Sequence, residues 1–150
     1  MKKVLVIYHS QEFGNTEACA KLVARGAQEV GGVEVKLINT NVMQRVDMSE
    51  LAACDGVAFG SPDYGSYVAG TIKQIFDDIY VANKSGLAIA SKPCVLFMTH
   101  GGGGKGIEPF KSMARRFALV ADPFTCQGAP EQECVGALDL GRKLAQAVLK

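Results

Sequence analysis

The chain has 150 residues, of which 48% are hydrophobic and 21% are charged, and its formal net charge is +1. A chain of this length buries enough apolar surface to fold without disulfide staples, and we predict one domain over residues 1–150. The balanced charge lacks the basic excess of nucleic-acid-binding proteins, so we expect no nucleic-acid partner.

Apolar runs and amphipathic runs alternate along the chain, as they do in proteins built from β–α units. The alternation predicts a parallel sheet with right-handed crossovers. The expected strands are residues 4–8, 33–38, 55–60, 92–98 and 120–126. The expected helices are residues 15–30, 49–53, 69–80, 107–119 and 131–149.

The chemistry of the strands also indicates their order in the sheet. Residues 33–38 alternate apolar and polar side chains, and residues 120–126 contain Asp122 and Pro123, so both read as edge strands. The other strands are apolar throughout, as central parallel strands are. We therefore predict an α/β, doubly wound domain with a five-stranded parallel sheet of order 2-1-3-4-5 and helices on both faces. In that order, ligand-binding loops follow the first and third strands.

The loop after the first strand combines hydroxyls, an amide and a glycine, and it opens directly into a helix. Helix N-termini offer free backbone N–H groups and partial positive charge, which favour phosphate. Gly14 lets the backbone approach a ligand, while Ser10, Asn15 and Thr16 can donate hydrogen bonds to phosphate oxygens. No lysine or arginine lies in this loop, so the phosphate would be held by neutral dipoles.

The loop after the third strand carries Pro62, Tyr64, Gly65 and Tyr67 on a tight turn. Its aromatic faces suit a flat, conjugated ligand at the carboxyl edge of the sheet. A turn whose tyrosines simply cap the core is the alternative for this stretch taken alone.

The loop after the fourth strand is rich in glycine, from Gly101 to Gly106. Its backbone N–H and C=O groups can rim the edge of a heteroaromatic ring. The run also satisfies the Gly-x-Gly-x-x-Gly pattern of dinucleotide sites, which is a weak signal here because no acidic residue follows at the expected spacing. It is not a phosphate-binding P-loop, because Lys105 is followed by Gly106 and not by serine or threonine.

Together these three loops predict a mononucleotide with a large planar ring, and FMN fits that description. Over essentially its whole length the chain resembles flavodoxins and flavodoxin-like FMN proteins. Ser10, Gly14, Asn15 and Thr16 match the family's phosphate loop, although this loop has one extra residue and Phe13 stands where a hydroxyl often precedes the glycine. The resemblance implies that Tyr64 is the flavin-stacking aromatic.

Gly60 and Gly65 fall at the two glycines that accompany this aromatic in the family. The family's usual second stacking aromatic has no counterpart among residues 101–104. No catalytic residue and no metal ligand is assigned. The expected cofactor-binding residues are Ser10, Gln11, Glu12, Phe13, Gly14, Asn15, Thr16, Ser61, Pro62, Asp63, Tyr64, Gly65, Ser66, Tyr67, Thr99, His100, Gly101, Gly102 and Gly103.

The resemblance implies an FMN-binding redox protein that carries electrons between a reductase and an acceptor. Typical flavodoxins are strongly acidic, and the net charge of +1 departs from that pattern. An NAD(P)H-dependent FMN oxidoreductase acting on quinones or similar acceptors is therefore the alternative, with Tyr67 and His100 as candidates to line the acceptor site. The partner is then a redox protein or a small organic electron acceptor.

A cofactor-free signalling or interaction domain of the same topology is less favoured. A receiver-like domain of that kind needs an acidic cluster at the strand ends to hold Mg²⁺, and here the first strand ends in Tyr8-His9-Ser10.

The remaining sequence signals concern the compartment. The N-terminus lacks a signal peptide's long apolar region, and no run approaches the length of a membrane span. We therefore expect a cytoplasmic protein with no membrane insertion.

The five cysteines are scattered without a Cys-x-x-Cys pair, which argues against iron–sulfur and structural zinc sites. Of these cysteines, Cys134 is expected to be the most exposed.

Overall fold

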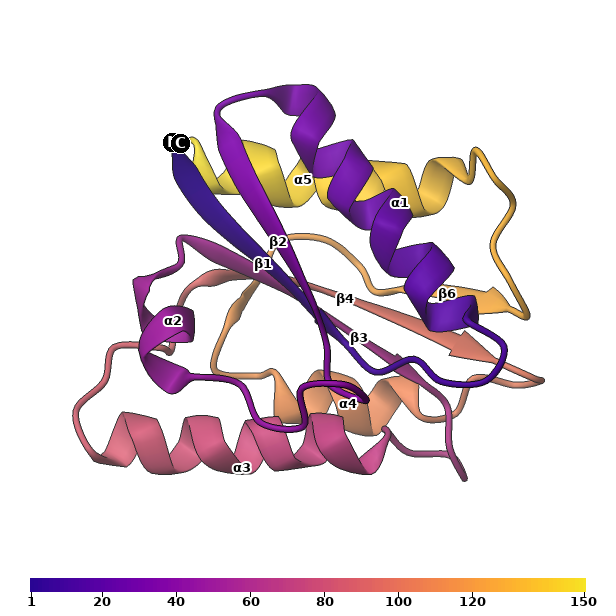
Figure 1. Ribbon diagram of the computed structural model, residues 1–150, viewed down its shortest axis with the longest axis horizontal. Coiled ribbons are helices and arrows are strands. Elements are labelled where there is room, and N and C mark those ends of the chain that lie inside the picture. Colours follow the sequence, from indigo (N-terminus) through magenta and orange to yellow (C-terminus); the bar gives the residue numbers. More distant parts are fainter.

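A computed structural model describes residues 1–150, and Figure 1 shows a twisted sheet with helices on both of its faces. The helices are α1 (Asn15–Val30), α2 (Met48–Ala53), α3 (Gly70–Lys84), α4 (Ile107–Met113) and α5 (Val135–Val148). The strands are β1 (Lys2–Tyr8), β2 (Val33–Asn39), β3 (Gly56–Pro62), β4 (Pro93–His100), β5 (Ala118–Leu119) and β6 (Phe124–Gln127).

All strand pairs are parallel, and the sheet runs β2-β1-β3-β4-β5, with β6 also paired to β4. The predicted order 2-1-3-4-5 is therefore confirmed. The strand predicted over residues 120–126 is shorter in the structure, where β6 covers Phe124–Gln127, and the short strand β5 (Ala118–Leu119) forms within the segment predicted to be helical; residues 120–123 separate the two. Proline has no N–H group to give to the ladder, and the break falls on the segment that contains Pro123.

Several predicted boundaries differ from the structure. The helix predicted for residues 107–119 ends at Met113, and the helix predicted for residues 131–149 begins at Val135, because residues 131–134 form a turn in which Cys134 N–H donates to Glu131 O at 3.1 Å. β3 and β4 both run two residues further than predicted, to Pro62 and His100. The longer strands carry their polar carboxyl ends out to the edge of the sheet.

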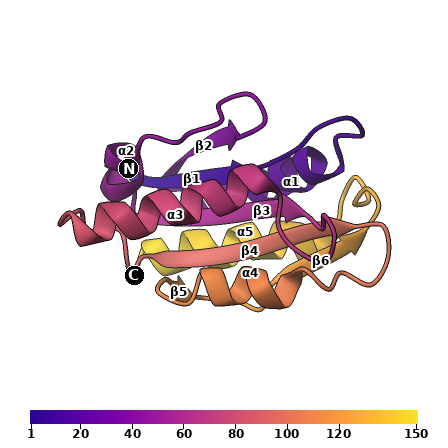
Figure 2. The same cartoon turned by 90° about the horizontal axis from the view of Figure 1, so that it is seen from below.

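Two apolar cores fill the space between the sheet and its helices. Figure 1 shows α1 and α5 on one side of the strands and α3 and α4 on the other, and Figure 2 looks onto the face that α3 and α4 cover. On one face, α1 and α5 pack on Val4, Val6 and Tyr8 of β1; on the other, α2, α3 and α4 pack on Leu5 and Ile7. The alternation along β1 follows from the two-residue period of a strand. None of the helices is long and apolar enough to cross a membrane.

Cysteine exposure differs slightly from the expectation. Cys134 is half-buried, but so is Cys126, while Cys19, Cys54 and Cys94 are buried. All five are free thiols, and burial raises the pKa of Cys54 to about 11. The buried thiols therefore stay protonated and act as small core residues.

Lys92 joins α2 to the start of β4. Its ammonium group donates to the carbonyl oxygens of Ala52 at 2.8 Å and Cys54 at 2.7 Å, at the C-terminal end of α2. Replacing Lys92 with methionine should lower the free energy of unfolding by about 1–3 kcal/mol, because hydrogen bonds from a charged donor are lost and both carbonyls lose a partner.

Urea denaturation of Lys92→Met measures this loss. Lys21, an exposed lysine whose ammonium group makes no ion pair or hydrogen bond, supplies the matched control, and Lys21→Met should change stability little. Equal stability of the two variants would contradict the role given to Lys92.

Candidate functional site

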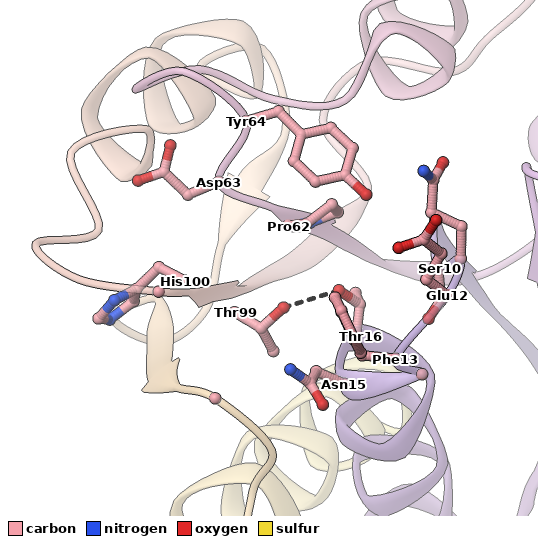
Figure 3. A pocket seen from close by; sticks show the side chains of 14 residues that line it. Ser10, Glu12, Phe13, Asn15, Thr16, Pro62, Asp63, Tyr64, Thr99 and His100 are labelled. Carbon is pink, nitrogen blue, oxygen red and sulfur yellow. Dashed lines mark hydrogen bonds between the residues drawn. The ribbon is translucent and has the colours of Figure 1, made fainter.

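A cavity of about 420 Å³ opens at the carboxyl edge of the sheet, where the loops after β1, β3 and β4 meet. This edge, at the switch point between β1 and β3, is where open α/β sheets bind ligands. We call it the three-loop cavity (Figure 3). Its lining residues are Ser10, Gln11, Glu12, Phe13, Gly14, Asn15, Thr16, Pro62, Asp63, Tyr64, Thr99, His100, Gly101 and Gly128.

The β1–α1 loop presents unpaired backbone donors to the cavity. Gly14 adopts the left-handed conformation with φ 70°, and its N–H donates to Gln11 O at 2.9 Å, which turns the chain sharply into α1. No acceptor in the chain takes the N–H groups of Asn15 and Thr16, and Gly14, which precedes the helix, has no side chain to cap them. Free amides at a helix N-terminus are suited to an anionic group such as phosphate.

Two hydroxyls tie the start of α1 to the end of β4. Thr16 and Thr99 are both buried, and their side-chain oxygens lie 2.7 Å apart (Figure 3). One of their two hydroxyl protons makes this bond, so the other stays available to a ligand. Ser10 supports the same helix end, because its hydroxyl oxygen accepts from Glu17 N–H at 3.1 Å.

Tyr64 brings an aromatic face to the cavity (Figure 3). Its backbone N–H donates to Tyr67 O at 3.0 Å across a turn in which both Gly65 and Ser66 have φ 63°. Tyr64 as a whole is 45% exposed. Partial burial and the nearby Glu12 carboxylate raise the pKa of the Tyr64 hydroxyl, so the ring stays neutral at physiological pH.

Ser61 lies beneath this turn and is fully buried. Its hydroxyl accepts from Ala69 N–H at 2.9 Å and donates to Pro62 O at 2.7 Å. Ser61 therefore shapes the turn from below and does not line the cavity.

The third wall of the cavity consists of the end of β4 and of Gly128, which was not among the predicted site residues. Thr99, His100 and Gly101 line the cavity. Beside them lies Gly128, which follows β6 and whose N–H donates to His100 O at 2.9 Å. The signal that would have found Gly128 is topological, since the last strand of the predicted sheet also ends at this edge.

The structure thus brings thirteen of the predicted site residues into one cavity and leaves the others outside its lining. Those outside are Ser61, Gly65, Ser66, Tyr67, Gly102 and Gly103. Tyr67 is 40% exposed. For the residues in both groups, contact with a cofactor stays a prediction.

The polar groups of the cavity are suited to a ligand with both donors and acceptors. Neither lysine nor arginine lines it, whereas the carboxylates of Glu12 and Asp63 do. Asp63 Oδ1 and His100 Nδ1 are buried without a hydrogen-bond partner. Neither atom faces the centre of the cavity: the Asp63 carboxylate is turned toward Gly106, whose backbone nitrogen lies 3.5 Å from Oδ2, and His100 points away from Thr16 and Thr99 (Figure 3).

Comparisons with known proteins agree with this architecture, although no family model matches the chain. A flavodoxin from Aquifex aeolicus (strain VF5) is 38% identical over 108 residues, which is 72% of this chain and 55% of that protein. The quinone-oxidoreductase QR2 of Triphysaria versicolor is 31% identical over 123 residues, covering 71% of this chain and 59% of that protein. The chain thus spans little more than half the length of these curated relatives.

Solved structures match over nearly the whole chain. A flavodoxin from the domain Archaea covers 99% of both chains, with a TM-score of 0.80 and 24% identity. A flavodoxin, WrbA-like protein from Agrobacterium tumefaciens covers 99% of this chain and 98% of its own, with a TM-score of 0.80 and 18% identity. At these identities the likeness establishes the fold.

Proposed function

Because this chain belongs to the flavodoxin-like family, we propose that its three-loop cavity binds FMN and that the protein transfers electrons through that flavin. The observation that carries the proposal is the meeting of free helix amides and an aromatic face in one cavity at the switch point of the sheet. A volume of about 420 Å³ lies within the range of cofactor and small-molecule sites.

Each part of FMN has a fitting set of residues in the cavity. The amides of Asn15 and Thr16, with the Ser10 and Thr16 hydroxyls, would hold the phosphate. Tyr64 would stack on the ring, and the backbone at His100 and Gly101 would border its polar edge. The bound flavin supplies the electron-accepting ring, while the protein supplies orientation and electrostatics.

Electron carriage between a reductase and an acceptor is the activity we propose, with a redox protein or a small organic molecule as partner. An NAD(P)H-dependent oxidoreductase of quinones is the second candidate. It is favoured by the similarity to a quinone-oxidoreductase and by the open space around Gly101 and Gly102, where an added Cβ atom would meet no atom within 4 Å. Mixing the loaded protein with NAD(P)H under anaerobic conditions separates the two, because only the enzyme should lose its flavin colour rapidly.

Titration of the apoprotein with FMN and with riboflavin tests the proposed cofactor. FMN should bind about 100-fold more tightly or better, because a few hydrogen bonds to a charged phosphate contribute about 1.5–3 kcal/mol each and riboflavin lacks that group. Quenching of flavin fluorescence gives both dissociation constants. Equal affinities would remove the phosphate site from the α1 N-terminus, and no binding of either ligand would favour the cofactor-free alternative.

A further inference from the structure

His9 lies directly behind the wall of the three-loop cavity. It follows the last residue of β1 and is only 5% exposed. Although His9 is not itself a lining residue, its ring contacts two residues that are, Gln11 and Tyr64. On its other side it contacts Thr71 of α3.

The hydrogen bonds of His9 have a definite direction. Its Nε2 lies 2.8 Å from Gln11 Oε1, and an amide oxygen only accepts, so Nε2 carries a proton. In the neutral ring, Nδ1 is then an acceptor, and the Thr71 hydroxyl donates to it at 2.6 Å.

Thr40 completes this chain of hydrogen bonds. Its hydroxyl lies 2.7 Å from the Thr71 oxygen and 3.3 Å from Tyr8 O, and the shorter contact takes its single proton. Tyr8 O is already paired, since it accepts from Thr40 N–H at 2.7 Å. The bonds therefore run from Thr40 to Thr71 to His9 to Gln11, and the end of β2 and the start of α3 hold the imidazole in place.

The hydrogen bond from His9 fixes the orientation of the Gln11 side-chain amide. With Oε1 held by His9, its amide NH₂ group has no partner in the chain and remains a donor in a residue that lines the cavity. The same imidazole meets the Tyr64 ring edge to face, with centroids 6.0 Å apart and an interplanar angle of 77°. One buried side chain thus supports both a polar and an aromatic part of the wall.

We propose that His9 is a positioning residue for the cofactor site: it orients Gln11 so that the amide NH₂ group donates to acceptor oxygens of the bound ligand. This inference rests on the proposed binding of FMN, whose ribityl and phosphate oxygens are acceptors of that kind. A His9 that merely filled the core would support the cavity without acting through Gln11.

Two polar variants test the hydrogen bonds of the two imidazole nitrogens separately. His9→Gln can place an amide NH₂ group near the former Nε2 and keep the bond to Gln11, whereas His9→Asn can keep only the contact with Thr71. We expect His9→Gln to bind FMN within about twofold of the wild type, and His9→Asn and Gln11→Ala each to bind about fivefold more weakly, since each loses roughly one net hydrogen bond.

The double variant supplies the decisive comparison. If His9 acts through Gln11, adding His9→Asn to Gln11→Ala should weaken FMN binding by no more than about twofold further, because the coupled bond is already lost. Wild-type affinity in His9→Asn or in Gln11→Ala, or a full additional loss in the double variant, would overturn the inference. Gln11 is exposed, so Gln11→Ala remains informative even if a His9 variant fails to fold.

A measurement without flavin keeps this inference distinguishable from the proposed function. Nitrogen-15 NMR of the apoprotein should show the neutral His9 ring protonated on Nε2. Protonation on Nδ1 would overturn the hydrogen-bond direction, whether or not FMN binds. Failure of the wild-type protein to bind FMN, with the Nε2 proton in place, would instead overturn the proposed function and retain the orientation of Gln11.

Discussion

Replacing Tyr64 with alanine is expected to weaken FMN binding by about tenfold or more. The Tyr64 ring is the aromatic face that lines the three-loop cavity together with the β1–α1 loop. Stacking of a ring on an aromatic side chain contributes about 1–3 kcal/mol, which corresponds to roughly five- to 150-fold in a dissociation constant. Fluorescence titration of the apo variant gives the constant directly.

Two neighbouring substitutions control for this result. Tyr64→Phe keeps the ring and should bind FMN within about twofold of the wild type, because stacking does not require the hydroxyl. Tyr67→Ala removes a side chain outside the cavity lining but keeps the backbone oxygen that accepts from Tyr64 N–H, and it too should bind almost normally. Normal binding by Tyr64→Ala together with weak binding by Tyr67→Ala would show that Tyr67, and not Tyr64, stacks on the flavin ring.

The sheet order and three walls of the cavity were predictable because they depend on strong local patterns. Apolar strands, an edge strand that alternates and a proline in another strand together determine the order, and the carboxyl ends of parallel strands share one edge. The helix Asn15–Val30 was predicted at both ends, and its C-terminal end is marked by Gly31, which has a positive φ in the structure. Such residues mark helix ends independently of the rest of the fold.

The remaining features depend on contacts between distant parts of the chain. The acidic residues Glu131 and Glu133 favour a helix start locally, but α5 begins only at Val135. Gly128 enters the cavity wall through its bond to His100 O, 28 residues earlier in the sequence. His9 was not predicted because its importance arises only where Thr71, Gln11 and Tyr64 meet around it.

Charge separates this chain from the acidic proteins that its family resemblance leads one to expect. A negative surface steers basic partners and increases the rate of encounter, and a net charge of +1 offers little of that long-range attraction. Reduction by a protein partner should accordingly depend weakly on ionic strength. This property is consistent with a small organic acceptor, and it is one reason to test the quinone-reducing alternative alongside electron carriage.

Replacing Gly141 with alanine is expected to lower the free energy of unfolding by about 3 kcal/mol. Alanine in place of glycine inside a helix ordinarily raises that free energy by about 1 kcal/mol. The reason for the loss here is the contact between α1 and α5, which cross backbone to backbone. A Cβ atom at Gly141 would lie 1.8 Å from Val23 O, and one at Gly26 would lie 2.0 Å from Leu138 O. Both neighbours are main-chain atoms, so the helices themselves must separate.

Chemical denaturation of Gly141→Ala and Gly26→Ala measures this cost, with Gly70→Ala as the matched control. Gly70 begins α3, and a Cβ atom there would meet nothing within 4 Å, so the control should be neutral or up to about 1 kcal/mol more stable. Because α1 also supplies the free amides of Asn15 and Thr16, separation of the helices should weaken FMN binding as well. A Gly141→Ala protein as stable as the Gly70→Ala protein would show that α1 and α5 are not held by this close crossing.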